Sequence, residues 1–112
     1  MQILEYLDER GRSPFAAWFE KLSPSAAARV ATALYRLESG NLSKVEGVGK
    51  GVFERKIDLG PGYRVYFGKD GGTAMILLGG GSKQRQREAI AASQERWADY
   101  KRRRGAHTSD EV

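Results

Sequence analysis

Four basic residues lie where predicted strands and turns would bring distant positions together. Arg55, Lys56 and Arg64 occur in strand-like runs on either side of a tight Gly-Pro-Gly reversal. Lys83 directly follows the run Gly79-Gly80-Gly81-Ser82, which we expect to form a turn. Strands held side by side by such a reversal would gather their cations in one patch. A concentrated positive patch is what a polyanion-binding protein, or an enzyme that acts on a phosphodiester, requires.

Strand alternation sorts these residues between the two faces of the predicted sheet. Lys56 and Arg64 fall together on one face, which we expect to be open, and Glu54 and Tyr66 share that face. Arg55 falls on the opposite, core-facing side, a conflict that snorkelling of its guanidinium to a sheet edge would resolve. The residues of the core-facing side are Phe53, Arg55, Ile57, Tyr63, Val65 and Phe67.

Simpler interpretations of the same residues stay open. Lys56 can pair with Glu54 or Asp58 across the sheet and have no other role. Lys83 stands at a predicted helix start, where a cation opposes the helix dipole, so a bound anion would explain it better. The glycine run before it lacks the glycine that directly precedes the lysine of nucleotide-hydrolysing phosphate loops, which excludes that class. His107 is the single histidine and lies near the C-terminus, which argues against histidine-based acid–base catalysis and against a metal site.

Composition and charge narrow the class of binding partner. The chain has 112 residues, enough for one domain, with a formal net charge of +5 and an isoelectric point near 9.7. Its positive charge is concentrated between residues 83 and 104, which favours an anionic partner. It has no cysteine, no apolar run long enough for a membrane span and no signal-peptide pattern, so we expect a cytoplasmic protein without a disulfide.

The elements that must position these residues form the order β-α-α-β-β-β-α, an α+β fold. Ser13-Pro14 and Ser23-Pro24 are helix-start signals, and they predict two short helices packed as an α-hairpin. Three consecutive strands form an antiparallel meander in a small antiparallel sheet, joined by the N-terminal strand. We expect a single domain over residues 1–104 and a flexible tail over residues 105–112. The expected elements are a strand at 2–7, helices at 14–22 and from 24 to about 39, a loop at 40–51, strands at 52–59, 63–68 and 73–78, and a helix from 82 to about 104.

Several segments together resemble the RelE/ParE toxin superfamily, and in particular its HigB-like group of addiction module killer proteins. The segments are Gly40-Asn41, Gly51-Val-Phe-Glu54-Arg-Lys-Ile57, Gly60-Pro-Gly-Tyr-Arg-Val-Tyr-Phe67, Leu77-Leu-Gly-Gly and Ser82-Lys83-x-x-Gln86. The likeness extends from about residue 2 to residue 101 and includes the order of the elements, so it implies a RelE-like fold.

The resemblance implies a toxin of a type II toxin–antitoxin system. Its RelE-like and HigB-like members cleave mRNA on the ribosome without a metal or other cofactor. By position, Lys56, Arg64 and Lys83 match the basic residues of that group's site. The chain departs from RelE enzymes at Glu54, where they have a further lysine, and near Ala89, where they have a tyrosine. It departs from the HigB-like group at Ser82, where aspartate is usual. The implied partners are the ribosome, mRNA and a helix-turn-helix antitoxin.

Metal-free RNA cleavage gives each candidate residue a role. Arg64 suits stabilisation of a phosphorane, Lys56 in its neutral form or Glu54 suits the base, and Lys83 is our candidate for the leaving-group acid. The residues expected to contact RNA are Arg55, Tyr66, Arg85 and Arg87. Two other functions stay open: a ParE-like, non-catalytic inhibitor of DNA gyrase, and an inactive or accessory nucleic-acid-binding protein.

Overall fold

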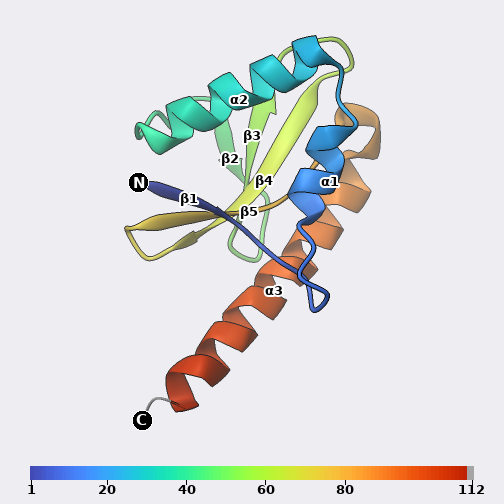
Figure 1. Cartoon of the computed structure of the whole chain (residues 1–112). Helices are drawn as coiled ribbons and strands as arrows, with labels where there is room; N and C mark the ends of the chain where they lie inside the picture. Colours follow the sequence, from blue (N-terminus) through green and yellow to red (C-terminus); the bar gives the residue numbers. More distant parts are fainter. Residues whose placement is uncertain (111–112) are drawn as a thin grey trace.

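The computed structural model describes residues 1–110, with side chains described up to Gly105, and it confirms the α+β fold. A sheet lies between two helices on one side and one long helix on the other (Figure 1). Along the chain the elements are β1 (Gln2–Glu5), α1 (Pro14–Glu20), α2 (Pro24–Glu38), β2 (Val45–Gly47), β3 (Val52–Ile57), β4 (Tyr63–Asp70), β5 (Ala74–Ser82), the 3₁₀ turn η1 (Lys83–Arg85) and α3 (Gln86–Asp110).

The sheet has five strands in the order β1-β5-β4-β3-β2. The predicted meander is present, because β3, β4 and β5 pair antiparallel in sequence order. Two details differ from the expectation. The N-terminal strand β1 pairs parallel with β5, so the sheet is mixed, and the predicted loop contains the short edge strand β2, which pairs antiparallel with β3.

Local signals fixed the starts of α1 and α2 as predicted. The hydroxyl oxygens of Ser13 and Ser23 accept hydrogen bonds from the backbone N–H groups of Ala16 and Ala26, with a proline at the first helical position of each helix. The two helices do not form the expected α-hairpin. α1 packs mainly on β5 and α2 on β3 and β1, and Figure 1 shows α2 crossing above the strands while α1 lies below the start of α2 and runs up towards it.

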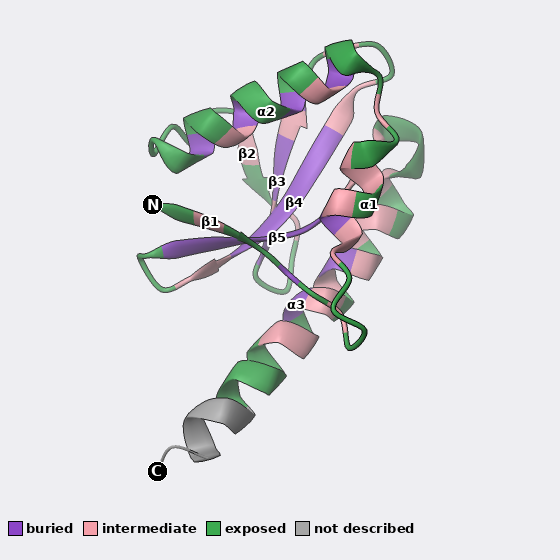
Figure 2. Ribbon diagram, in the orientation of Figure 1, coloured by how far each residue is buried: buried purple, intermediate pink, exposed green. Residues whose placement is uncertain are grey.

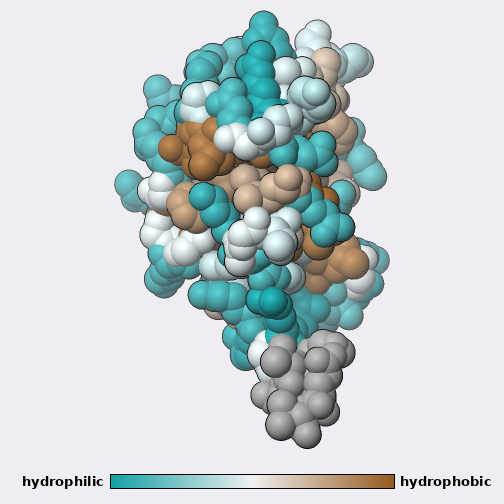
Figure 3. Space-filling model, turned by 90° about the vertical axis from the view of Figure 1, so that its left-hand side faces the viewer, coloured by the Kyte–Doolittle hydropathy of each residue, from teal (hydrophilic) through white to brown (hydrophobic). Residues whose placement is uncertain are grey.

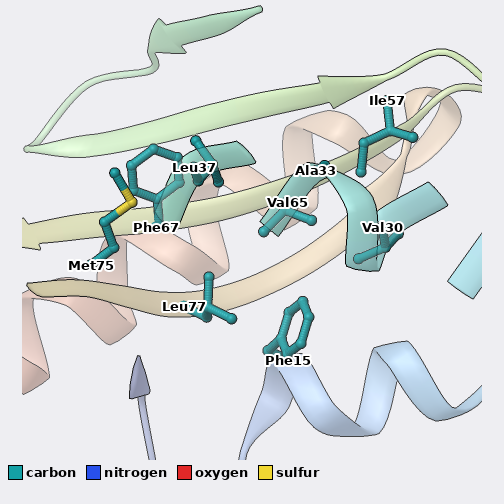
Figure 4. Packing of buried hydrophobic residues seen from close by; sticks show 9 residues of the cluster. All are labelled: Phe15, Val30, Ala33, Leu37, Ile57, Val65, Phe67, Met75 and Leu77. Atoms are coloured by element: carbon teal, nitrogen blue, oxygen red, sulfur yellow. The ribbon is translucent and has the colours of Figure 1, made fainter. Parts of the chain in front are cut away.

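The core between the sheet and helices α1 and α2 is apolar. Its nine buried residues come from both helices and from three strands, and their side chains point into the space between the layers (Figure 4). Burying apolar surface from both layers is what holds these helices on the sheet. The nine residues are Phe15, Val30, Ala33, Leu37, Ile57, Val65, Phe67, Met75 and Leu77.

A second core lies on the opposite face, beneath α3, so the face that we expected to be open is covered. Trp97 of α3 packs there on Tyr66 of β4 and on Ile76 of β5 as parts of one buried cluster. Figure 2 shows that β4 and β5 are buried along most of their length, as both faces are covered. Tyr66, Glu54 and Arg64 are therefore buried rather than exposed.

The glycine run before Lys83 is part of β5 and does not form the predicted turn. A Cβ atom on Gly80 would lie 2.3 Å from the Trp18 ring, so only glycine lets α1 approach the strand this closely. The register with β4 slips within this strand. Tyr66 is paired with Gly79 and Phe67 with Leu77, which leaves Leu78 as an extra residue in a β-bulge. Arg96 of α3 donates a hydrogen bond to the Leu78 carbonyl oxygen at 2.9 Å.

The C-terminal helix is longer than the sequence predicted. α3 continues to Asp110, past the boundary predicted at Arg104, while the His107 side chain and residues 111–112 lie outside the described residues. Figure 3 shows one side of the molecule as mainly hydrophilic, with hydrophobic residues in separate areas. No helix within the described part of the chain is long and apolar enough to cross a membrane.

Candidate functional site

Three of the predicted cations line one hollow at the end of the β3–β4 hairpin. We call this space of about 510 Å³ the hairpin hollow. It is lined by Lys56, Arg64 and Lys83, with Asp58 and the turn residues 59–62. Lys56 and Arg64 are directly opposite each other on β3 and β4, and the backbone N–H of Lys83 donates to the Gly62 carbonyl oxygen at 2.8 Å. Sheet pairing and this hydrogen bond thus bring together side chains from three segments.

The turn itself is held in a conformation that favours glycine. Gly60 and Gly62 have φ angles of 55° and 76°, in the left-handed region. The Gly62 N–H donates to the Leu59 carbonyl oxygen at 3.0 Å, which closes the turn. The predicted reversal is confirmed, and it forms the floor between the strand cations and Lys83.

Glu54 lies behind the hollow and anchors Arg64. Its side chain is 1% exposed, and its Oε2 atom accepts hydrogen bonds from the Tyr66 hydroxyl at 3.0 Å and from Gln86 Nε2 at 2.8 Å. Arg64 Nε lies 3.5 Å from the same oxygen. A carboxylate enclosed in this way cannot reach a substrate, so the prediction of Glu54 as an exposed base is wrong. Glu54 instead positions the Arg64 guanidinium.

Arg64 is held between this carboxylate and the hollow. Its side chain is 9% exposed, and Arg64 Nη1 lies 3.4 Å from the Gly62 carbonyl oxygen, in a weak hydrogen bond. The buried ion pair with Glu54 fixes the direction of the guanidinium, since moving it away would leave a buried carboxylate unpaired. An arginine held from behind presents its remaining donors to an oxyanion in a fixed orientation.

Tyr66 belongs to the same buried network. It is fully buried beneath α3, so the prediction that it contacts RNA is wrong. Burial, together with the neighbouring Glu54 carboxylate, raises the pKa of Tyr66 well above its usual value, so its hydroxyl stays protonated and donates to Glu54.

The other two cations of the hollow are solvent-accessible. Lys56 Nζ lies 3.5 Å from Glu46 Oε1 of β2, so neither carboxylate that we expected as its partner pairs with it. Both side chains of this pair are largely exposed, and such a pair contributes little to stability. Lys83 is exposed and makes no ion pair with any carboxylate that the structure describes. Both ammonium groups are therefore accessible to an anion.

Asp58 is the remaining charged residue of the hollow. Its carboxylate lies 2.8 Å from Lys44 Nζ, and this hydrogen bond, with the charge of Lys44, lowers the pKa of Asp58. A carboxylate whose proton affinity is reduced in this way is a weak base.

The remaining sequence candidates lie elsewhere. Arg55 faces α2 on the opposite side of the sheet, where its Nη1 donates to the Lys56 carbonyl oxygen, so its inclusion in the Lys56 and Arg64 patch is wrong. Arg85 of η1 and Arg87 in the first turn of α3 are exposed, outside the lining of the hairpin hollow, and Arg85 pairs with Glu88 at 3.6 Å.

Sequence reasoning missed two residues of this site. Gln86 is the second hydrogen-bond donor to Glu54, and its only signal was its place three residues after Lys83 in a segment that resembles the HigB-like group. Glu46 was missed because the strand that carries it has three residues and was predicted as loop. Among the described residues no cluster of three or more histidine, cysteine or acidic side chains could hold a metal ion.

Comparison with known proteins adds one relative. No family model matches the chain. A protein of Haemophilus influenzae (strain ATCC 51907 / DSM 11121 / KW20 / Rd), described only as an uncharacterized protein, is 40% identical over 77 residues, which cover 68% of this chain and 78% of the relative. The chain belongs to the same family as this protein.

Proposed function

We propose that the chain is a metal-independent endoribonuclease that cleaves mRNA on the ribosome, as the toxin of a type II toxin–antitoxin pair. The observation that carries the proposal is the hairpin hollow, which brings two accessible ammonium groups and one fixed guanidinium together. An mRNA phosphodiester fits the charge of such a site. The resemblance to the RelE/ParE superfamily supports the same function, and action on ribosomes implies a cytoplasmic location.

In the proposed reaction, the 2′-hydroxyl oxygen attacks the adjacent phosphorus and the bond to the 5′ oxygen breaks. The products are a 2′,3′-cyclic phosphate and a 5′-hydroxyl. Arg64 stabilises the extra negative charge of the phosphorane, and Glu54 keeps Arg64 in place. Lys56 in its neutral form accepts the proton of the 2′-hydroxyl, and Lys83 donates a proton to the leaving oxygen. Lys56 can take this role only as the free amine, because its ammonium form, which pairs with Glu46, has no lone pair. Asp58 is disfavoured as the base because Lys44 binds its carboxylate.

The proposal assigns much of the rate to the ribosome. The hollow is open and offers no described feature that would hold the attacking hydroxyl in line with the leaving oxygen, whereas a bound ribosomal mRNA can be held in that geometry. Free RNA should therefore be cleaved poorly, and translated mRNA well. The cognate partner that we propose is a helix-turn-helix antitoxin.

The test uses inducible expression of the wild-type chain, Lys56→Ala, Lys83→Ala and the matched control Lys21→Ala in a bacterium. Lys21 is exposed and lies outside the hollow. We expect new mRNA 5′ ends, mapped by primer extension, for the wild type and for Lys21→Ala, and loss of these ends for both hollow variants. Because Lys56 and Lys83 are at the surface, their variants should keep the melting temperature of the wild type.

Two results would overturn the proposal. Unchanged mRNA cleavage in Lys56→Ala and Lys83→Ala would show that the hairpin hollow takes no part in the reaction. Growth arrest that survives both substitutions, without any mRNA cleavage, would instead favour a non-catalytic inhibitor such as the ParE-like alternative.

A further inference from the structure

A second basic hollow lies on the other face of the sheet, between α2 and the end of β3. We call this space of about 300 Å³ the α2 hollow. Arg29, Thr32, Ala33 and Arg36 line it from one side of α2, since these positions are three or four residues apart on the helix. Its other lining residues are Lys44, Arg55, Ile57 and Asp58.

Arg55 lies at the floor of the α2 hollow and has an unused hydrogen-bond donor. The residue is 4% exposed, and its Nη1 donates to the Lys56 carbonyl oxygen. Its Nε is buried and has no hydrogen-bond partner among the described residues. Buried polar groups nearly always have a partner, so the unused donor indicates a missing acceptor. Burial and the nearby charge of Arg36 lower the pKa of Arg55, which still leaves an arginine charged at neutral pH.

The charge around Arg55 is strongly positive. Four cationic side chains line the hollow, whereas Asp58 is the only carboxylate among the described residues that line it and is already bound by Lys44 at 2.8 Å. Arg29 and Arg36 are exposed and form no ion pair with any carboxylate that the structure describes. Several guanidinium groups around one space form a typical binding arrangement for a phosphate group.

The two hollows are neighbours. Asp58 lines both of them, and the adjacent residues Arg55 and Lys56 point to opposite faces of β3, one into each hollow. A polymer that passes around the end of β3 would therefore contact both. Because we assign the neighbouring hairpin hollow to RNA, this continuity favours a nucleic-acid strand over an acidic peptide as the occupant of the α2 hollow.

We infer that the α2 hollow binds a backbone phosphate of the same RNA strand whose cleavage we assign to the hairpin hollow. The inference rests on the proposed function for the identity of the strand. Arg55 binds the phosphate from the floor of the hollow, and Arg29 and Arg36 bind it from the helix. The contact fixes the path of the RNA on one side of the cleaved bond.

The test measures binding with purified full-length protein and a short 2′-O-methyl oligoribonucleotide, which lacks the attacking hydroxyl and stays intact. Affinity is measured at several salt concentrations for the wild type, Arg29→Ala, Arg36→Ala and the control Lys21→Ala. Loss of one phosphate contact should reduce the slope of log affinity against log salt by about 0.7 and the affinity at 0.1 M salt about fivefold. Lys21→Ala should leave both quantities unchanged.

NMR titration distinguishes the source of the anion. The Nε–H signal of Arg55 should shift with the oligoribonucleotide, and with inorganic phosphate at higher concentration, but not with a poly-glutamate peptide. A shift with the peptide and none with the oligoribonucleotide would overturn the inference in favour of a protein partner. Response to inorganic phosphate with an unchanged salt slope for RNA would also overturn it, since the site would then take only the free ion.

The failure of this inference can be told apart from the failure of the proposed function. An unchanged salt slope in Arg29→Ala and Arg36→Ala, with cleavage still dependent on Lys83, would rule out RNA binding in the α2 hollow and leave the proposed nuclease function intact. A reduced slope in both variants, with cleavage independent of Lys56 and Lys83, would support the α2 hollow as a nucleic-acid site and rule out the nuclease function of the hairpin hollow.

Discussion

The two faces of the sheet are stabilised in different ways. The face beneath α1 and α2 has a core of nine apolar side chains (Figure 4), with the buried charge of Arg55 beside it in the α2 hollow, whereas the face beneath α3 encloses the buried ion pair of Glu54 and Arg64 within an apolar cluster. Apolar packing lowers the free energy of the fold directly, but a buried ion pair is often no more stabilising than apolar residues of equal volume. The first face therefore supplies stability, whereas the buried ion pair of the second face adds little stability but holds Arg64 towards the hairpin hollow.

The substitution with the largest expected effect breaks the ion pair on the α3 face. Arg64→Ala leaves Glu54 buried without its cation, which should cost about 3–5 kcal/mol of unfolding free energy and abolish mRNA cleavage. The double variant Glu54→Gln, Arg64→Ala has no unpaired charge, so urea denaturation should show most of the stability restored. Cleavage should stay absent in the double variant, and its return would show that Arg64 serves only the fold.

The matched substitution on the other face should affect stability alone. Met75→Ala creates a cavity in the apolar core at the end of β5 remote from Lys83, and it should cost about 2–5 kcal/mol. At a temperature where the variant is folded, cleavage per molecule should equal that of the wild type. A selective loss of cleavage would mean that the two faces are coupled more closely than their packing indicates.

A smaller effect, the pH dependence of the unfolding free energy, should distinguish the α3 face from the face beneath α1 and α2. Tyr66→Phe removes one donor to Glu54 and should cost about 1–3 kcal/mol at neutral pH. Because the pKa of Tyr66 is raised in the folded chain, its stabilising contribution is fully present below the ordinary value of 10.0 and is lost as pH rises through the folded pKa. Urea titrations above pH 10 should therefore show a steeper loss of stability for the wild type than for Tyr66→Phe. Equal slopes would contradict a raised pKa at this residue.

Much of the fold could be predicted because its signals are local. The caps at Ser13 and Ser23, the reversal at residues 60–62 and the alternation along β3 and β4 depend on neighbouring residues only. Alternation placed Lys56 and Arg64 on one face without any knowledge of the sheet order. It also placed Arg55 on the opposite face, where the α2 hollow explains the charge that seemed out of place in a core position.

The rest could not be predicted because it depends on contacts between distant segments. Nothing local indicates that α3 covers the face of Glu54 and Tyr66, so these two residues were expected at the surface. Gly79–Gly81 have the composition of a turn, yet the strand continues through them because Trp18 and α3 require a surface without side chains. The edge strand β2 is too short to show an alternating pattern, and its Glu46 was missed with it.

The bulge at Leu78 determines on which side of the sheet the chain leaves β5. Leu78 and Gly79 both face α3, so a single supernumerary residue inverts the in-and-out phase of every position that follows. If the same residues continued in regular alternation without the bulge, the side chain at the strand exit would lie on the α1 side, away from Arg64. A bulge in one glycine-rich stretch thus decides whether a lysine six residues after Leu77 lies on the same side of the sheet as Lys56 and Arg64.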